Sequence, residues 1–385
     1  MTIDRRAAIA GAAAALAATR TLAQGIPAGL PTDNTPLKFV AVEELAPQVL
    51  KALGPGAYAF LAGGHTDEWT LRENREAFHH FAIEPHYLAG NPAAPDTKVT
   101  ILGSTLAAPI MTAPVGGQGL FHARADLATA EGTKAAGNLM ICSSAATATL
   151  EQIAAASGPK WFQLYLPEDR GVTADLLQRA KASGYTAVTF TIDTLGAGNS
   201  DELQRSGLQV QAALQAAAAR ITAGAPGANI PRGGQKRNLG WDDVEFVQKA
   251  SGLPVLLKGV LTPALAKQAI QRGCAGVQVS NHGGRQMDGV HASIDVVGPI
   301  ADAMAGKGVI VMDSGIRRGA DIFKALALGA DCVAIGRAAM YGLVLGGAQG
   351  VTSVHDKLRE ELVSTMRASG AADIKSIDRS FVSKA

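Results

Sequence analysis

A histidine and an arginine stand three residues apart in the segment Ser280-Asn281-His282-Gly283-Gly284-Arg285. An imidazole can accept a proton near neutral pH, and a guanidinium can hold a carboxylate through two parallel hydrogen bonds. The apolar run before the segment is typical of a short buried strand, and the paired glycines favour a turn after it. The segment therefore predicts a base and a carboxylate-binding group just beyond a strand. The alternative is a strand-end loop with an incidental histidine and arginine, which the rest of the chain weakens.

Apolar runs of strand length recur eight times and alternate with segments of helical character. The runs are Pro109–Pro114, Leu139–Ser144, Trp161–Tyr165, Ala187–Asp193, Pro254–Gly259, Gly276–Asn281, Val309–Gly315 and Cys332–Arg337. This alternation predicts an α/β protein, a (β/α)8 TIM barrel, in which the chemistry lies at the C-terminal ends of the strands. A doubly wound open sheet is the main alternative, but no GxGxxG motif follows the first strand.

Polar side chains end the predicted strands and would meet at the barrel mouth. They are Ser143, Gln163, Tyr165, Thr191, Asp193, Lys258, His282, Arg285, Asp313, Arg317 and Arg337. The glycines and arginines after the last two strands predict a phosphate site, which barrels commonly place there. Lys258 suits an anion, a Schiff base or an electron-rich flavin, and Asp193 could orient His282. A Schiff-base aldolase is thus an alternative, although such an enzyme does not need His282 and Arg285.

Two segments lie outside the repeating pattern. Residues 36–81 predict an N-terminal helical extension of the barrel. Residues 203–240, after the fourth strand, form a long alanine-rich stretch. Long loops in compact domains are commonly lids, so we expect a mobile lid over the barrel mouth here. Residues 36–385 would then make up one domain.

The first residues have the features of an export signal. Arg5-Arg6 precede a short, weakly apolar alanine-rich run, and small residues precede Gln24. We expect residues 1–23 to be a twin-arginine-type signal peptide, which implies a periplasmic or otherwise exported protein. No other stretch predicts an integral membrane span.

Composition narrows the classes of partner. The 385 residues are 47% hydrophobic with a net charge of +2, so nothing global indicates nucleic acid binding. The cysteines, Cys142, Cys274 and Cys332, lie in or beside apolar runs. No CxxC pair or Cys/His cluster is present, so we expect buried thiols, no disulfide framework and no metal site.

In combination, these motifs resemble the FMN-dependent 2-hydroxy acid oxidases and dehydrogenases, from about Pro36 to the C-terminus. The resemblance rests on residues 63–78, 112–114, 162–165, 258–259, 280–286, 313–330 and 335–337. It implies an FMN-binding barrel that oxidises a small-molecule 2-hydroxy acid to a 2-oxo acid. The electrons would pass to oxygen or to a separate acceptor. Members of this family are often homotetramers, so the resemblance also implies a homotetramer.

The matching motifs imply roles for individual residues. His282 would be the catalytic base with Asp193 as its partner, and Tyr165 would contact the hydroxyl side of the substrate. Arg285 would bind the substrate carboxylate, and Lys258 would stabilise reduced FMN. The other residues expected to hold FMN are Ala113, Pro114, Val115, Gly116, Ser143, Gln163, Thr191, Ser280, Asp313, Gly315, Arg317, Gly336 and Arg337.

The chain departs from the family pattern at the substrate side. Phe60 stands where the family usually has a tyrosine, and no arginine follows Asp193 before Arg205, so half of a two-arginine carboxylate clamp is missing. A lost charged hydrogen bond costs about 1.5–3 kcal/mol, which weakens a small 2-hydroxy acid roughly ten- to a hundredfold. Ala145 and Gly116 replace larger family residues, so we expect a roomier pocket and a substrate bulkier than lactate. A different FMN-dependent substrate, or a weakly catalytic flavin-binding protein, are the alternatives.

Overall fold

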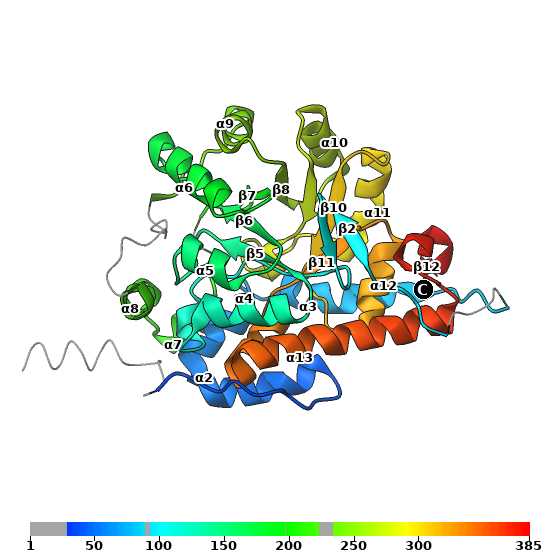
Figure 1. Ribbon diagram of the computed structural model, residues 1–385, viewed down its shortest axis with the longest axis horizontal. Helices are drawn as coiled ribbons and strands as arrows, with labels where there is room; N and C mark the ends of the chain where they lie inside the picture. The colour runs from blue at the N-terminus through cyan, green and yellow to red at the C-terminus, as the bar shows by residue number, and fades with distance from the viewer. Residues whose placement is uncertain (1–28, 89–92, 197, 223–233) are drawn as a thin grey trace, which may run out of the picture.

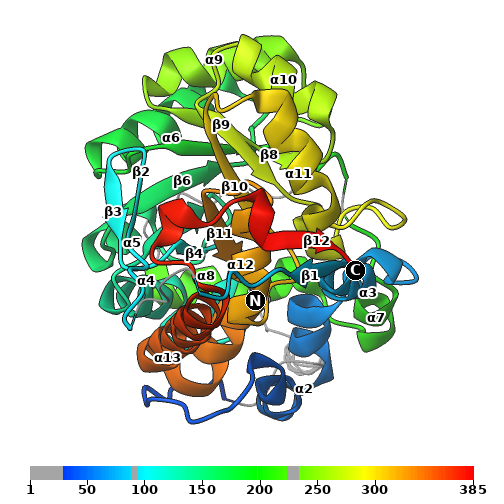
Figure 2. The same ribbon diagram turned by 90° about the vertical axis from the view of Figure 1, so that its right-hand side faces the viewer.

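Eight parallel strands close into a barrel in the order β10-β11-β4-β5-β6-β7-β8-β9 (Figures 1 and 2). The computed structural model describes residues 29–88, 93–196, 198–222 and 234–385, so the predicted signal peptide lies outside the described residues. The barrel strands are β4 (Ile110–Thr112), β5 (Leu139–Ser143), β6 (Lys160–Leu164), β7 (Val188–Thr191), β8 (Val255–Val260), β9 (Gly276–Val279), β10 (Val309–Asp313) and β11 (Cys332–Ile335). Each coincides with a predicted run to within two residues at either end, which confirms the predicted (β/α)8 barrel.

The barrel strands are buried on both faces, which is why most of their residues are apolar. In β5, for example, all five residues are buried. Leu139 and Ile141 belong to one apolar cluster with Trp161 of β6, while Met140 joins the larger cluster that contains the helices. The antiparallel hairpin of β2 (Val99–Ile101) and β3 (Ser104–Leu106) packs against the smaller cluster through its own buried side chains.

Helices form the outer layer of the barrel (Figure 2). They are α4 (Ala125–Ala135), α5 (Leu150–Ala156), α6 (Arg170–Ala182), α9 (Trp241–Ser251), α10 (Pro263–Gln271), α11 (Ser293–Met304), α12 (Gly319–Ala327) and α13 (Arg337–Ser369). Helix α13 is kinked at Gly346-Gly347 and packs against α4 and against α2 of the N-terminal extension. Among the described residues, no helix has both the length and the apolar character needed to cross a bilayer.

The predicted N-terminal extension is helical. It contains η1 (Val42–Leu45), α2 (Ala46–Ala62), α3 (Trp69–Glu76) and η2 (Ala77–His80). Helix α2 is kinked before Pro55, where Gly54 has a φ of 71°. The extension ends in β1 (Phe81–Ile83), which pairs antiparallel with β12 (Val382–Lys384) at the other end of the chain.

The segment after the fourth barrel strand is largely helical where it is described. It contains α7 (Asp201–Ser206) and α8 (Val210–Thr222), and residues 223–233 lie outside the described residues. The long loop expected after the fourth strand is therefore partly helical, because alanine favours helix strongly. Helix α8 packs on η3 (Gln118–Leu120), with Ala217 fully buried. The role of this segment as a mobile lid stays a prediction.

Candidate active site

A cavity of about 410 Å³ lies at the C-terminal ends of the barrel strands. It is bordered by most of the predicted site residues: Phe60, Ala113, Pro114, Val115, Gly116, Tyr165, Lys258, His282, Arg285, Asp313, Gly315, Arg317, Gly336 and Arg337. The remaining ones, Ser143, Gln163, Thr191, Asp193 and Ser280, do not border it. The structure thus brings together, at one mouth, groups that come from every part of the sequence.

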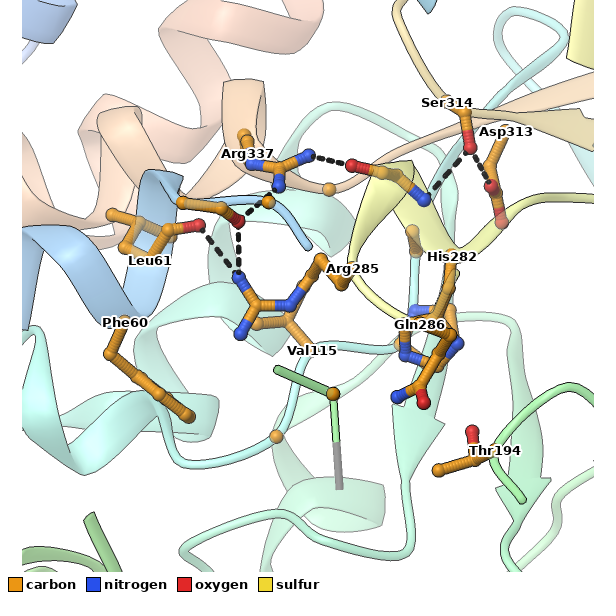
Figure 3. A pocket seen from close by; sticks show the side chains of 18 of the residues that line it. Phe60, Leu61, Val115, Thr194, His282, Arg285, Gln286, Asp313, Ser314 and Arg337 are labelled. Atoms are coloured by element: carbon orange, nitrogen blue, oxygen red, sulfur yellow. Dashed lines mark hydrogen bonds between the residues drawn. The ribbon is translucent and has the colours of Figure 1, made fainter. Parts of the chain in front are cut away.

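His282 is held in an uncommon backbone conformation. It follows β9 in the short helix η5 (His282–Gly284), and its φ of 58° lies in the left-handed region that side-chain-bearing residues rarely adopt. Ser280 Oγ accepts a hydrogen bond from the backbone N–H of His282 at 3.0 Å. Ser314 Oγ accepts one from Gly283 at 3.1 Å (Figure 3). Such local strain persists only where neighbours fix it, and here it points the imidazole into the cavity.

The imidazole of His282 lies between a carboxylate and a phenol. Its Nδ1 is 3.0 Å from Asp193 Oδ1, and its Nε2 is 3.4 Å from Tyr165 Oη. Burial lowers the pKa of His282, and the positive charges of Lys258 and Arg285 lower it further, although Asp193 opposes them. The ring is therefore neutral at neutral pH. With its Nδ1–H donated to Asp193, its Nε2 lone pair can accept a proton.

Asp193 is ionised although it is buried. Burial alone would raise its pKa, but the interaction with His282, which includes a hydrogen bond, and the positive charge of Lys258 more than offset this, so the pKa lies below its usual value. Gly259 follows Lys258 with a φ of 104°, and a Cβ there would lie 2.6 Å from Asp193 Cβ. A glycine at position 259 is thus needed to bring this carboxylate behind the imidazole.

Lys258 is a buried cation held by its own counter-ion. Its Nζ donates to Ser280 Oγ at 2.8 Å and lies 3.5 Å from Asp313 Oδ2. Burial would lower the pKa of Lys258, but Asp313 and Asp193 reverse the effect and raise it. Asp313 also accepts hydrogen bonds from Gln278 and Ser314, both at 2.7 Å. This pair therefore places a fixed positive charge at the floor of the cavity.

Three predicted cofactor residues form a buried chain of hydrogen bonds. Ser143 Oγ donates to Gln163 Oε1 at 3.0 Å, and Gln163 Nε2 donates to Thr191 Oγ1 at 2.9 Å. The chain links the ends of β5, β6 and β7. Contact of these side chains with a cofactor stays a prediction, because they bond to one another here.

Arg285 and Phe60 form the far wall of the cavity. The guanidinium lies over the phenyl ring, 5.4 Å from its centroid, and donates to the carbonyl of Gly63 at 3.2 Å (Figure 3). The ring stands where a hydroxyl-bearing side chain was expected. The expectation that Gly116 opens space is wrong, because a Cβ there would lie 2.9 Å from Ala145 Cβ. The two small residues instead pack against each other.

The part of the cavity that fits a phosphate lies next to Arg285, because Arg285 and Arg337 donate to the same Gly63 carbonyl. Arg337 donates to the carbonyls of Gly63 and Gly283, both at 2.8 Å (Figure 3). Burial lowers the pKa of Arg337 to about 10, which leaves the group charged, and its buried Nε meets no acceptor among the described residues. Arg317 pairs with Glu43 at 2.8 Å. A Cβ on Gly315 would overlap the Asn74 carbonyl, so the backbone must be glycine there. Two cations and an unpartnered donor suit an anionic group.

Several contributing residues were missed at the level of sequence. Ser314 and Gln286 lie within the motif segments 313–330 and 280–286, so their position next to predicted site residues is the signal that could have identified them. Asn281 bonds through its amide to Asn74 of α3, at 2.7 and 2.9 Å. Glu43 and Arg237 carry no local motif, and only the tertiary structure brings them to the site.

Three cysteine thiols and one surface cluster of potential metal ligands lie outside the barrel mouth. Cys142, Cys274 and Cys332 are buried free thiols, as predicted. Glu73, His80 and Asp295 bring one potential metal ligand each to within 4.8 Å of one another on the surface. Exposed carboxylates often gather without a metal, so this cluster assigns no site, and the absence of a metal centre stays a prediction.

Known proteins resemble this chain over almost its whole length. A family model described as FMN-dependent dehydrogenase matches residues 50–384. An L-lactate oxidase of Lactobacillus jensenii is 39% identical over 348 residues, which cover 89% of this chain and 85% of that protein. The crystal structure of a lactate oxidase from Pediococcus acidilactici superposes with a TM-score of 0.85 and 36% identity, over 93% of this chain and 98% of that one. A mandelate oxidase solved with (S)-2-phenylpropionate gives a TM-score of 0.82 and 33% identity, over 90% and 99%.

Proposed function

The chain belongs to the FMN-dependent dehydrogenase family, and we propose that it oxidises a 2-hydroxy acid to the 2-oxo acid with His282 as the base. The cofactor is FMN, as in the homologous oxidases, and the chain is an FMN-dependent 2-hydroxy-acid oxidase or dehydrogenase. One observation carries the proposal. The Nε2 of His282, whose Nδ1 bonds to Asp193 at 3.0 Å, faces the same cavity as Arg285.

Different residues of the chain would bind the substrate, accept its proton and stabilise the protonated base. Arg285 binds the substrate carboxylate, and the neutral His282 accepts one of the two protons that the substrate loses. Asp193 stabilises the imidazolium that forms, because the two groups already share a hydrogen bond. FMN, when bound, would supply the two-electron oxidation and the onward transfer of the electrons to oxygen or to another acceptor.

FMN would be held at both of its ends. Arg317 and Arg337, with the backbone at Gly315 and Gly336, suit its phosphate, because they border one end of the cavity. Lys258 would place its fixed charge beside the flavin and so favour the electron-rich reduced form. The flavin would also be held by four polar side chains and by the backbone of residues 113–116. The side chains are those of Ser143, Gln163, Thr191 and Ser280.

The substrate we propose is larger than lactate. Ala145 leaves the wall beside Val115 small, and Phe121, Leu203 and Val210 add an apolar surface to the cavity. The mandelate oxidase that this chain resembles was solved with a phenyl-bearing acid. An FMN-dependent reaction on a substrate without a carboxylate is the second candidate, favoured by Phe60 and by the missing second arginine.

Anaerobic titration of the purified holoenzyme tests the proposed function. Glycolate, lactate, mandelate and longer 2-hydroxy acids are added in turn while the visible band of oxidised flavin is recorded. Bleaching by one of these acids is the expected result. The rate at which colour returns in air then separates an oxidase from a dehydrogenase. If bound flavin stays oxidised with every 2-hydroxy acid, the proposal is wrong, and the candidate without a carboxylate takes its place.

Replacing Phe60 with tyrosine should strengthen binding of small 2-hydroxy acids. The ring lies beside the Arg285 guanidinium, so the new hydroxyl would reach the space in which the carboxylate binds. One hydrogen bond contributes about 0.5–1.5 kcal/mol, which corresponds to a KM roughly two- to tenfold lower for lactate. Phe121→Tyr is the control at the neighbouring ring. An unchanged KM for lactate in Phe60→Tyr would show that the carboxylate binds elsewhere.

Two further proposals concern the protein outside its active site. We propose that residues 1–23 direct export to the periplasm by the twin-arginine route. Changing Arg5 and Arg6 to lysine should then leave the protein in the cytoplasm of an expressing bacterium, and cell fractionation would detect this. We also propose a homotetramer, which light scattering of the purified protein would test.

A further inference from the structure

Four arginines border the cavity, and three of them are held by the protein. Arg285 and Arg337 donate to the carbonyl of Gly63, and Arg317 pairs with Glu43. The fourth, Arg237, makes no hydrogen bond or ion pair with any residue in the described part of the chain. It is an exposed side chain at the rim of the cavity. This cation needs an explanation that the proposed reaction does not give.

The backbone before Arg237 is tied to the barrel. The N–H of Lys236 donates to the carbonyl of Leu166 at 2.8 Å, and Gln235 Nε2 donates to the carbonyl of Thr194 at 3.0 Å. Pro167 and Gln235 also form an antiparallel bridge. Arg237 is thereby positioned next to the strand ends that carry Tyr165 and Asp193.

Nearby carboxylates are already paired with other cations. Asp243 is fully buried and accepts from Lys236 Nζ through both oxygens at 2.8 Å. Arg170 lies 3.0 Å from Asp242 and 3.2 Å from Asp243. The adjoining sequence 223–233 contains no aspartate or glutamate. Arg237 is thus placed to meet an anion that comes from outside the chain.

The charges around the cavity lead to the same conclusion. Lys258 is balanced by Asp313. The phosphate of FMN carries close to two negative charges at neutral pH, which suit Arg337 and also Arg317 beside its ion pair with Glu43. The carboxylate of a 2-hydroxy acid suits Arg285. Of the four arginines that border the cavity, Arg237 is the one with neither an acceptor nor a counter-ion among the described residues.

Arg237 is not placed to replace the missing arginine of the carboxylate clamp. The loop after Asp193 leaves Thr194 beside Gln235 and reaches Asn199, whose carbonyl accepts from Thr66 N–H at 2.8 Å. The far end of the loop therefore adjoins Gly63 and Arg285, whereas Arg237 adjoins its start.

We propose that Arg237 binds a second carboxylate at the distal end of the substrate, so that the preferred substrates are 2-hydroxydicarboxylates. This inference rests on the proposed function. The methylene groups between the two carboxylates would run along the apolar surface formed by Leu203 and Val210. A charge-assisted hydrogen bond at the rim would act on binding rather than on the chemical step.

Steady-state kinetics with matched substrates tests the inference. Malate is compared with 2-hydroxybutyrate, and 2-hydroxyglutarate with 2-hydroxyvalerate, in the wild-type enzyme, Arg237→Met and Arg237→Lys. We expect the wild type to prefer the dicarboxylates and Arg237→Met to raise their KM about ten- to a hundredfold, with kcat nearly unchanged. Monocarboxylates should be unaffected, and Arg237→Lys should retain part of the preference. Added salt should raise the KM of the dicarboxylates only in enzymes that keep the cation.

Arg205→Met is the matched control. Arg205 lies in α7, pairs with Asp201 and Glu202, and does not border the cavity. The substitution Arg205→Met therefore removes one positive charge, as Arg237→Met does, but at a site that does not contact the substrate. Equal KM values for dicarboxylates in wild type and Arg237→Met would overturn the inference, as would a wild-type preference for monocarboxylates. If monocarboxylates still bleach the flavin in that case, the proposed function stands. If no 2-hydroxy acid of either kind bleaches it, both fail.

Discussion

Replacing His282 with glutamine should slow reduction of the flavin by substrate on the order of 10²–10⁴-fold, or about 3–5 kcal/mol of activation free energy. Glutamine fills a similar volume but cannot accept a proton at neutral pH. The hydrogen bond between Nδ1 and Asp193, at 3.0 Å, shows that the ring is fixed in position before substrate binds. Anaerobic stopped-flow measurement of the flavin band gives the rate directly.

Two controls separate this loss from misfolding. The FMN content and the substrate Kd of His282→Gln should stay close to wild type, because Arg285 and the phosphate end are untouched. His79→Gln removes an exposed imidazole of η2 and should leave the rate unchanged. A reduction rate within about threefold of wild type would remove His282 from the role of base, since one positioned base contributes at least 10²-fold.

The second large effect is expected from Asp193→Asn. An amide behind the imidazole can donate to Nδ1, which would move the ring proton to Nε2 and block the position that must accept a proton. The rate of flavin reduction should fall on the order of 10²–10⁴-fold. Thr194→Val, beside it, removes a hydroxyl that also bonds to Asp193 and serves as the milder comparison.

The pH dependence distinguishes this mechanism from simple loss of packing. The negative charge of Asp193 raises the pKa of His282, against burial, which lowers it. Without that charge the pKa falls further, so the residual activity should persist to lower pH than in the wild type. The acid limb of log kcat/KM against pH records the shift. A limb that stays in place, or moves to higher pH, would contradict the pairing of these two groups.

The barrel could be predicted from sequence because its strands are buried on both faces. Runs such as residues 309–312 are apolar from end to end, and this pattern is visible in the sequence without knowledge of the neighbouring strands. The helices within residues 203–222 are harder to predict, because the low complexity of the sequence obscures the helix propensity of its alanines. The apolar side of α8 is fixed by contact with η3, which residue spacing along the chain does not reveal.

The part of the site that could be predicted from sequence is the part formed by residues in local motifs at the strand ends. His282, Arg285 and Lys258 were identified from strand-end positions, and they border one cavity. Arg237 and Glu43 could not be, because their relation to the cavity depends on contacts between distant segments. Gly116 shows a different limit. Its small size predicted open space, but Ala145 packs against this glycine, and that contact cannot be predicted from the sequence.

The pairing of β1 with β12 has a consequence for the order of synthesis. Residues 81–83 meet residues 382–384, and β4 meets β11, so the barrel and its N-terminal extension close only with the last part of the chain. A ribosome-bound fragment has neither Arg337 nor a closed ring of strands, and contacts between distant segments form slowly. FMN can therefore be captured only after residues 332–384 have been synthesised and have paired with the earlier strands. Growth conditions that limit flavin at that moment should yield apoprotein rather than a partly loaded intermediate.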